Sequence, residues 1–355
     1  MTTPAELYKN AIDLNRFSNS VARRIVRTYN NLIVDAMQRL ASVGADPTPT
    51  QAARLQAILA QLKGSLDQWA GTATALSVEE LQGLVELQTR FVTNVLNGEL
   101  PDDDLLLQVR SVQISPQFAQ AVATIDPTTY NVVTLSDDLG AAVTGTPRPF
   151  RLEIGDGTTI TLPNGATLAA SYTRLAGKQA EVFTKEVQNG LLLGESSDKI
   201  ARRLRRQLTA VPNNQIRAMV RTSVNQVANA ASQAVYSQNQ EITNRYRYIA
   251  TLDSRTSAIC RALDGRTFKY NEGPTPPQHF NCRSTTVPIV DYEGLGIPPP
   301  KPGKRRSSGG LVPANQTYGQ WLFDQSKEVK ADVLGVKQVP YFNMLSRKYG
   351  PSVAI

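Results

Sequence analysis

The chain contains little histidine, cysteine or aromatic side chain. Its 355 residues include one histidine and two cysteines, and aromatic residues make up 6%. Two cysteines exclude a framework of several disulfides and indicate a reducing compartment. The sequence has no apolar run of about 18 residues, the length expected of a transmembrane helix. Its opening, MTTPAELYKN, lacks the basic and apolar regions of a secretory signal. Hydrophobic residues make up 41%, so we expect a globular, helix-rich protein of about two domains.

Charge is unevenly distributed along the chain, although the total is only +8. Residues 1–150 carry 11 Lys/Arg and 15 Asp/Glu, whereas the remaining residues carry 27 and 15. A basic C-terminal part predicts contact with phosphate groups or an acidic protein, and the alternative is a surface that is merely biased in charge. The candidate nucleic-acid-binding residues lie in two basic runs, and they are Arg202, Arg203, Arg205, Arg206, Lys301, Lys304, Arg305 and Arg306.

The first 100 residues or so predict a helical bundle. A Thr3-Pro4 start and apolar residues at three- and four-residue steps predict a helix that ends near Gly44. A second helix carries Leu55 to Trp69. A third is predicted to begin at the cap motif Ser77-x-x-Glu80 and to stop at Asn97-Gly98.

Residues 101–145 give no clear pattern, and the period then changes to two. The segment PFRLEIGDGTTITLPNGATLA, residues 149–169, predicts a small antiparallel meander with turns at Gly155-Asp156-Gly157 and Asn164-Gly165. The GDG turn lacks the Lys-Ser/Thr of a phosphate-binding loop.

Helices are predicted again from Tyr172 to about Asn189, from Asp198, and over a long stretch that includes Arg221. Residues 296–312 are rich in proline, glycine and basic side chains, which predicts a linker or extended arm. A final helix is predicted to begin at Thr317-x-x-Gln320, to anchor through Trp321, and to end at Gly335.

The lone histidine and both cysteines fall in one stretch, DSRTSAICRALDGRTFKYNEGPTPPQHFNCRSTTVP, residues 253–288. Extended structure is predicted around a hairpin turn at Asp264-Gly265. Pro276-Pro277 predicts an extended approach to His279, and His279-x-x-Cys282 brings two possible ligands near one point. The cluster therefore suggests a metal site, a catalytic pair, a disulfide, or a folding signature.

The order of motifs here resembles the phage head morphogenesis family, of the Mu F-like and SPP1 minor head protein-like type. The resemblance covers about residues 191–290 and rests on RTS in a helix, then LDSRTSAIC, LDGRTF, PPQH and NCRS before VP. The residues that match the family motif are Arg221, Asp253, Arg255, Asp264, Gly265, Pro277, His279, Cys282 and Arg283. The chain departs from it at Ser223, Ser257 and Ser284, because members often have glutamate at the first position and cysteines at the others.

The resemblance and the residues together leave three states for Cys260, His279 and Cys282. A structural zinc ion would need a fourth ligand, for which Asp253, Asp264 or water are the candidates. A Cys260–Cys282 disulfide could form after lysis. The favoured interpretation is buried thiols beside a packed histidine. Arg255 and Arg283 are expected to cross-link the turns with the two aspartates. No second histidine offers an alternative general base, so no enzyme is predicted. No cofactor other than zinc is predicted.

The resulting expectation is an α+β protein: an N-terminal helical bundle, then a helical and small antiparallel β module with an extended basic arm and a C-terminal helix. The predicted parts are a helical attachment domain (1–145), the family module (146–295), a linker (296–312) and a docked tail (313–355).

The resemblance implies a minor capsid protein inside the phage head near the portal vertex, assembled in the host cytoplasm, which assists genome packaging or ejection. Expected partners are the portal protein, the major capsid or scaffolding protein, packaged double-stranded DNA through its phosphates, and other copies around the portal, with no membrane. An internal DNA-binding virion protein is the alternative, and a thiol-dependent enzyme is disfavoured.

Overall fold

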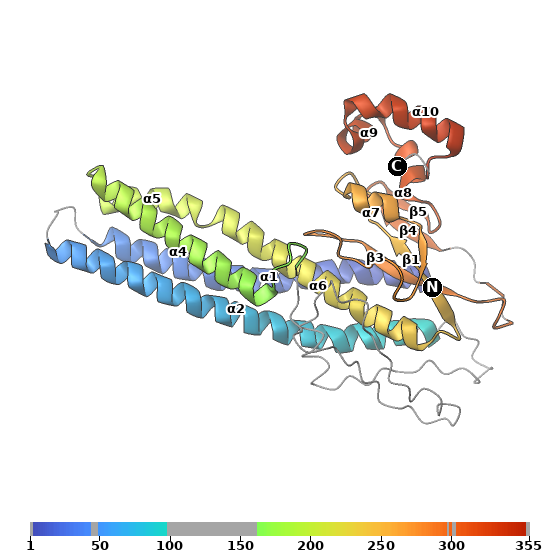
Figure 1. Cartoon of the computed structure of the whole chain (residues 1–355), viewed down its shortest axis with the longest axis horizontal. Coiled ribbons are helices and arrows are strands. Elements are labelled where there is room, and N and C mark those ends of the chain that lie inside the picture. The colour runs from blue at the N-terminus through green and yellow to red at the C-terminus, as the bar shows by residue number, and fades with distance from the viewer. Residues whose placement is uncertain (1–2, 44–48, 98–161, 297, 300–302, 353–355) are drawn as a thin grey trace, which may run out of the picture.

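The computed structural model describes residues 3–43, 49–97, 162–296, 298–299 and 303–352. In these residues the chain forms a long helical bundle joined at one end to a smaller part made of strands and short helices (Figure 1). The N-terminal helix begins at the same end as the strands. The helices come first in the chain and the small antiparallel sheet follows, which confirms the predicted α+β fold class.

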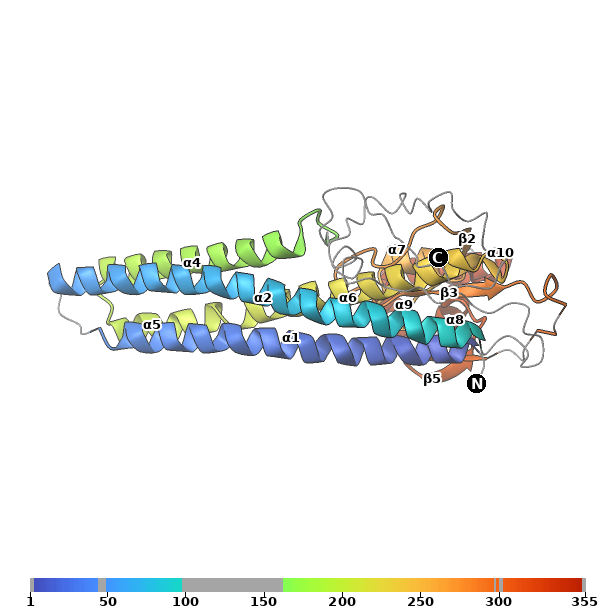
Figure 2. The same ribbon diagram turned by 90° about the horizontal axis from the view of Figure 1, so that it is seen from below.

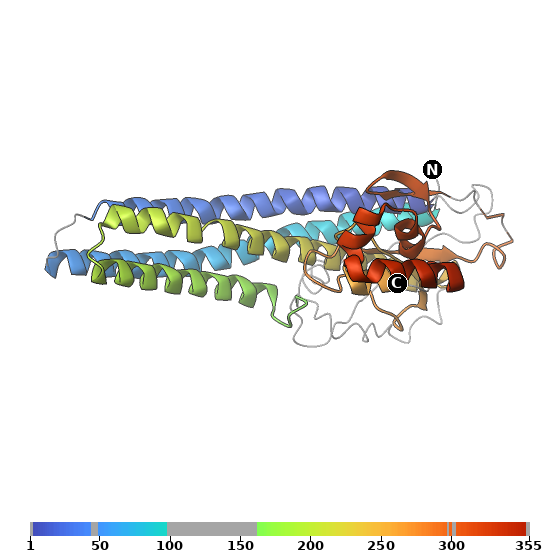
Figure 3. The same cartoon turned by 90° about the horizontal axis from the view of Figure 1, so that it is seen from above.

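The bundle consists, among the described residues, of α1 (Thr3–Ala41), α2 (Pro49–Asn97), α4 (Leu168–Leu192), α5 (Ser197–Gln207) and α6 (Ala210–Gln238). Figures 2 and 3 show α1 and α2 running along the whole molecule, with the other three helices beside them. The first helix forms because apolar residues spaced by three and four positions make one face. That face is buried at Val21, Ile25, Tyr29, Ile33, Ala36 and Leu40.

The predicted break between two helices at Ser77 is wrong, because α2 continues without interruption from Pro49 to Asn97. The Ser77 hydroxyl does not cap a helix. It donates to the Ala73 carbonyl at 2.7 Å and lies 3.0 Å from the hydroxyl of Tyr172 in α4. Bonding to the carbonyl one turn earlier lets a serine stand inside a helix. A motif that is typical of a helix start is thus overridden by packing against α4.

Helices on both sides of the predicted boundary at residue 145 share one hydrophobic core. The boundary itself lies outside the described residues. The shared core includes Ile25, Leu66, Tyr172, Phe183, Ile200, Leu204 and Ile216. The Tyr29 hydroxyl in α1 also donates to the Leu208 carbonyl after α5, at 2.9 Å. The N-terminal helices and those that precede the sheet therefore pack as one bundle.

Most of the predicted meander over residues 149–169 lies outside the described residues. At its described end, the predicted turn at Asn164-Gly165 is present: Gly165 has φ +78° and its amide donates to the Leu162 carbonyl at 2.8 Å. The turn leads into α4 rather than into a strand, because the Thr167 hydroxyl accepts from the Ala170 amide and caps the helix.

A three-stranded antiparallel sheet in the order β2-β1-β3 follows the bundle. Its strands are β1 (Thr243–Ile249), β2 (Thr267–Lys269) and β3 (Thr285–Val290). The prediction that the segment between β1 and β2 is extended is wrong in part, because this segment contains the short helix α7 (Ala258–Leu263). The Asp264-Gly265 turn exists, with Gly265 at φ +81°, but it joins α7 to β2 instead of joining two strands.

The predicted linker or extended arm contains a β-hairpin. Its strands are β4 (Lys304–Ser307) and β5 (Gly310–Pro313). The tail then forms α8 (Tyr318–Phe323), α9 (Lys327–Leu334), the 3-10 turn η3 (Val336–Gln338) and α10 (Val339–Tyr349).

The tail docks through α8, as Trp321 predicts. The Thr317–Gln320 capping box is present. Trp321 is buried in a cluster with Leu252, which follows β1. The single predicted helix is in fact two, since Ser326 caps a new one, although Gly335 ends it as expected. Among the described residues, no helix has the length and apolar character needed to cross a bilayer.

Candidate functional site

Both cysteines and the histidine come together in the folded chain. Cys260 lies in α7, which is capped by Ser257, and His279 and Cys282 lie in the segment that leads into β3. Cys260 Sγ is 3.3 Å from His279 Nε2 and 3.7 Å from Cys282 Sγ. The three ligand atoms all lie within 4.8 Å of one another. The Tyr248 hydroxyl is 3.2 Å from Cys260 Sγ, so a phenol closes one side of the cluster.

Backbone contacts fix the two ligands that come from the loop. His279 Nδ1 is 2.9 Å from the Phe280 carbonyl. An Nδ1–H that donates to this carbonyl leaves Nε2 with its lone pair facing the sulfur. The Cys282 amide donates to the His279 carbonyl at 3.1 Å. From α6, Asn225 Nδ2 donates to the Cys282 carbonyl at 2.6 Å, which ties the cluster to the helical bundle.

Hydrogen bonds within the cluster favour a negative charge on Cys260. The bond with Cys282 lowers the pKa of Cys260 against the effect of burial, and the bond with His279 lowers it further. The bond with Cys260, together with burial, raises the pKa of Cys282. The bond with Cys260 also raises the pKa of His279, although burial opposes it. A thiolate beside an imidazole is suited to metal binding or to nucleophilic chemistry.

The Asp253–Arg283 pair holds the turn after β1 to the start of β3, as predicted. Arg283 donates to both Asp253 oxygens at 2.5 and 2.8 Å, and the Thr256 hydroxyl adds a bond at 3.2 Å. Burial acts to raise the pKa of Asp253, but the bonds and charge of Arg283 outweigh it and the pKa is lowered. Arg255 contributes less, since its side chain is 81% exposed and lies 3.8 Å from the carboxylate.

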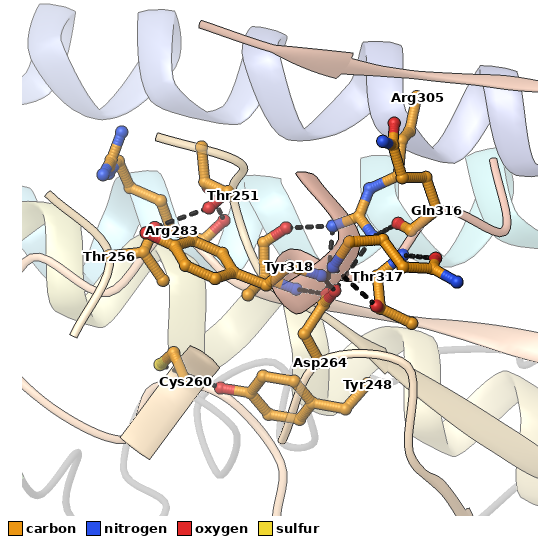
Figure 4. A network of polar contacts seen from close by, with 12 residues as sticks. Tyr248, Thr251, Thr256, Cys260, Asp264, Arg283, Arg305, Gln316, Thr317 and Tyr318 are labelled. Carbon is orange, nitrogen blue, oxygen red and sulfur yellow. Dashed lines mark hydrogen bonds and ion pairs between the residues drawn. The ribbon is translucent and has the colours of Figure 1, made fainter. Parts of the chain in front are cut away.

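Asp264 holds the second charged contact, and its partner is Arg305. Their side chains are 0% and 3% exposed, and two nitrogens of Arg305 approach the carboxylate at 3.0 and 3.1 Å (Figure 4). The amides of Ala250 and Tyr318 also donate to Asp264, each at 2.6 Å. The prediction that Arg305 contacts nucleic acid is therefore wrong. Alternation along β4 turns this side chain inward, between the exposed Lys304 and Arg306.

The two aspartates are not part of the cysteine–histidine cluster. The group of possible metal ligands found among the described residues contains only Cys260, His279 and Cys282. Asp253 and Asp264 are each engaged by an arginine instead. Of the three candidates for a fourth metal ligand, Asp253 and Asp264 are thus engaged elsewhere, and water is left. Of the other motif residues, Gly265 makes the turn after α7, and Pro277 follows a cis peptide bond in the loop before His279.

The predicted nucleic-acid-binding residues of α5 differ in their surroundings. Arg203 is bound to Glu186 and Glu195, at 2.7 and 2.5 Å, which ties α5 to the end of α4. Arg202 pairs with Asp198 at the surface, and Arg205 is exposed. The side chain of Arg206 and all of Lys301 lie outside the described residues.

A group of four arginines gathers where the bundle meets the sheet. It is formed by Arg217 and Arg221 of α6, Arg255 before α7, and Arg283. Burial, followed by the positive charges of the other three, lowers the pKa of Arg221. The Arg221 guanidinium donates to the neutral Asn19 amide oxygen at 3.1 and 2.8 Å. The sequence marks three of the four as motif residues, but only the fold brings Arg217 beside them.

Comparison with known proteins finds one relationship. Residues 181–287 match the model of a family described as Phage Mu protein F like protein. The matched span runs from within α4 into β3 and includes the cysteine–histidine cluster. No curated protein and no solved structure matches the chain significantly.

Proposed function

From the match of residues 181–287 to the phage Mu protein F-like family, a head morphogenesis family, we propose that the chain is a minor capsid protein of a tailed phage. It is incorporated in few copies, inside the head near the portal vertex, after synthesis in the host cytoplasm. There it assists procapsid assembly and genome packaging or ejection. Its partners are the portal protein, the major capsid or scaffolding protein, and further copies of itself.

The observation that carries this proposal is how the motif residues use their hydrogen bonds. Asp253 binds Arg283, and Asp264 binds Arg305 and the amide of Tyr318. These contacts join β1, β3, the β4–β5 hairpin and α8 into one unit. Side chains whose hydrogen bonds are all made within the chain stabilise its fold and are not available to bind a substrate. This arrangement suits an assembly protein.

The buried thiols give the enzyme alternative little support. Cys260 is 1% exposed and Cys282 is 2% exposed. A catalytic nucleophile has to reach a substrate atom, and reactive cysteines lie in partly exposed surroundings. Neither sulfur meets that condition, so the cluster supports a structural role.

The elongated shape supports two separate contact regions. The bundle extends far from the strands (Figures 1 and 2). The motif residues from Asp253 to Arg283 lie in the part that contains the strands, whereas Arg221 lies in α6 of the bundle. We place the portal or capsid contact on the bundle, formed by α1 and α2 together with α4 to α6. The part that contains the strands then faces the interior of the head.

Mass spectrometry of gradient-purified virions and of empty procapsids tests the proposal. The chain is expected in both, at a copy number close to that of the portal and far below that of the major capsid protein. The major capsid protein and the portal in the same samples are the internal standards. Particles that contain portal but none of this chain would contradict the proposal.

The arginine group favours one second candidate, a DNA-binding internal virion protein. Two members of this group contact neutral asparagine oxygens: Arg217 bonds Asn214 and Arg221 bonds Asn19. The other two, Arg255 and Arg283, share the carboxylate of Asp253. The group therefore presents positive charge to phosphates. The full chain with Arg217→Glu and Arg255→Glu should bind duplex DNA more weakly, with a shallower salt dependence. Arg54→Glu together with Lys63→Glu makes the same change of charge at two exposed positions in the first half of α2 and is the control. Equal binding by all three chains removes this candidate.

A further inference from the structure

We infer that Cys260, His279 and Cys282 bind a zinc ion, with a water molecule as the fourth ligand. The inference does not depend on the role of the chain in a phage head. It rests on the spacing of the three ligand atoms, the orientation of the imidazole, and the commitment of both nearby aspartates elsewhere.

The spacing fits tetrahedral zinc. With Zn–S bonds of about 2.3 Å, two thiolates on one zinc lie about 3.8 Å apart, and a thiolate and an imidazole nitrogen about 3.5 Å apart. The sulfurs of Cys260 and Cys282 are separated by 3.7 Å, and Cys260 Sγ lies 3.3 Å from His279 Nε2. The two pairs that include Cys260 therefore need shifts of a few tenths of an ångström. The third pair, Cys282 Sγ and His279 Nε2, lies within 4.8 Å and needs a shift of at most about 1.3 Å. A disulfide requires the sulfurs about 2.05 Å apart, so it demands a larger movement.

The surroundings of the ligands also fit a metal site. Metal-binding histidines usually donate their other ring N–H to a carbonyl or carboxylate. His279 Nδ1 is 2.9 Å from the Phe280 carbonyl, which directs Nε2 toward the sulfurs. The Tyr248 hydroxyl lies 3.2 Å from Cys260 Sγ and donates to it when that sulfur is a thiolate. Both contacts are made by fully or partly buried groups and hold the ligands in place.

The fold supplies a structural reason for the ion. From Asn271 to Ser284 the chain contains no helix or strand. The ion joins this loop to α7, which stands on the other side of the cluster. Two thiol protons leave for solvent as the thiolates form, so the charge of the ion is balanced by Cys260 and Cys282. Asp253 and Asp264 are bound to arginines, which leaves the fourth position to water.

The first experiment measures metal retained by the full-length chain. The protein is purified with added zinc, passed through gel filtration, and analysed by inductively coupled plasma mass spectrometry. Equimolar zinc is expected for the wild type, and loss of that zinc for Cys282→Ser. Cobalt substituted for zinc should give thiolate-to-cobalt charge transfer and the visible bands of a tetrahedral site. A wild type that retains no more zinc than the variant overturns the inference.

A second experiment adds a ligand instead of removing one, so it does not depend on a destabilised variant. The Ser257 hydroxyl lies beside the cluster, where it accepts from the Cys260 amide at 3.4 Å. Ser257→Cys should replace the water and slow the release of zinc to a chelator. Ala258→Cys adds a thiol at the next, exposed position and should leave the release rate unchanged. Equal rates for both variants contradict a site at this position.

The thiols of the wild-type chain give an independent readout. Zinc should protect both cysteines from an aromatic disulfide reagent, and a chelator should remove that protection. Intact mass measured without reductant identifies the competing states. A mass lower by both thiol hydrogens, or reactivity that does not respond to zinc or chelator, overturns the inference in favour of a disulfide or of free packed thiols.

Discussion

Single residues carry much of the stability of the strand-bearing part, and Asp264 is the clearest case. It is fully buried, and it accepts bonds from two backbone amides and from Arg305. Arg305 in turn donates to the carbonyls of Gln316 and Ala250. These bonds compensate for removing two charges from water. One ion pair thus connects β1, the turn after α7, the hairpin and the segment before α8.

Arg305→Ala should therefore lower the free energy of unfolding of this part by about 3–5 kcal/mol, because a buried carboxylate loses its partner. Arg306→Ala removes an exposed arginine from the same strand and should change it by less than about 0.5 kcal/mol. Both are made in a Trp69→Phe background, which leaves Trp321 of the tail as the fluorescent reporter during urea unfolding. If the two alanine variants lower the free energy of unfolding equally, the buried Arg305–Asp264 pair contributes no more to stability than an exposed arginine does.

The sequence predicts that Asp253 and Arg283 take part in charged contacts between turns and that the cysteines lie near His279, but it predicts neither the pairing nor the role of Arg305. The first contacts join residues of one short stretch with distinctive spacing. Arg305 stands in a run of basic residues, and the run has the same letters whether its members face solvent or a carboxylate. Only the alternation of β4, which is set by pairing with β5, separates Arg305 from its neighbours.

Elements are predicted well where an apolar period extends over many residues, as in α1, and less well at their ends. The cap motif at Ser77 is a local signal, whereas the continuity of α2 is decided by contact with Tyr172 of α4. The β4–β5 hairpin is missed for a similar reason. Its four-residue strands have too few positions to establish a period, and neighbouring proline and glycine resemble a linker.

Two glycines of α4 should respond oppositely to alanine, because one is exposed to open space and the other is packed. A Cβ at Gly177 meets nothing within 4 Å, so Gly177→Ala should stabilise the bundle by about 0.5–1 kcal/mol. A Cβ at Gly190 would overlap the buried Ile200 side chain of α5, so Gly190→Ala should destabilise it by about 1–3 kcal/mol. Urea unfolding followed by helical circular dichroism measures both. Stabilisation by Gly190→Ala would mean that α4 and α5 are not packed this closely.

The whole molecule is held together by hydrophobic cores that combine residues from distant parts of the sequence. The bundle core combines α1 and α2 with α4 to α6. A second cluster joins Leu7 of α1 and Val92, Val95 and Leu96 of α2 to Tyr246 and Ile249 of β1. Residues before position 98 therefore complete both the helical bundle and the region beside the sheet. Sequence patterns identify each apolar face but not the face that it meets, which is why separate domains are predicted where one shared core exists.

It follows that residues 162–355, although they contain the whole family-matched span, should not fold independently. Without α1 and α2, the buried side chains of α6, such as Ile216, Val220 and Val224, face solvent, and burial of that apolar surface is the main contribution to stability. We expect this fragment alone to aggregate or to unfold without a cooperative transition. Co-expression with residues 1–97 should restore a soluble pair that stays together in gel filtration. As a control, residues 1–97 carrying Leu66→Asp should fail to rescue, because that change places a charge in the shared core. A fragment 162–355 that unfolds cooperatively by itself would contradict the shared core.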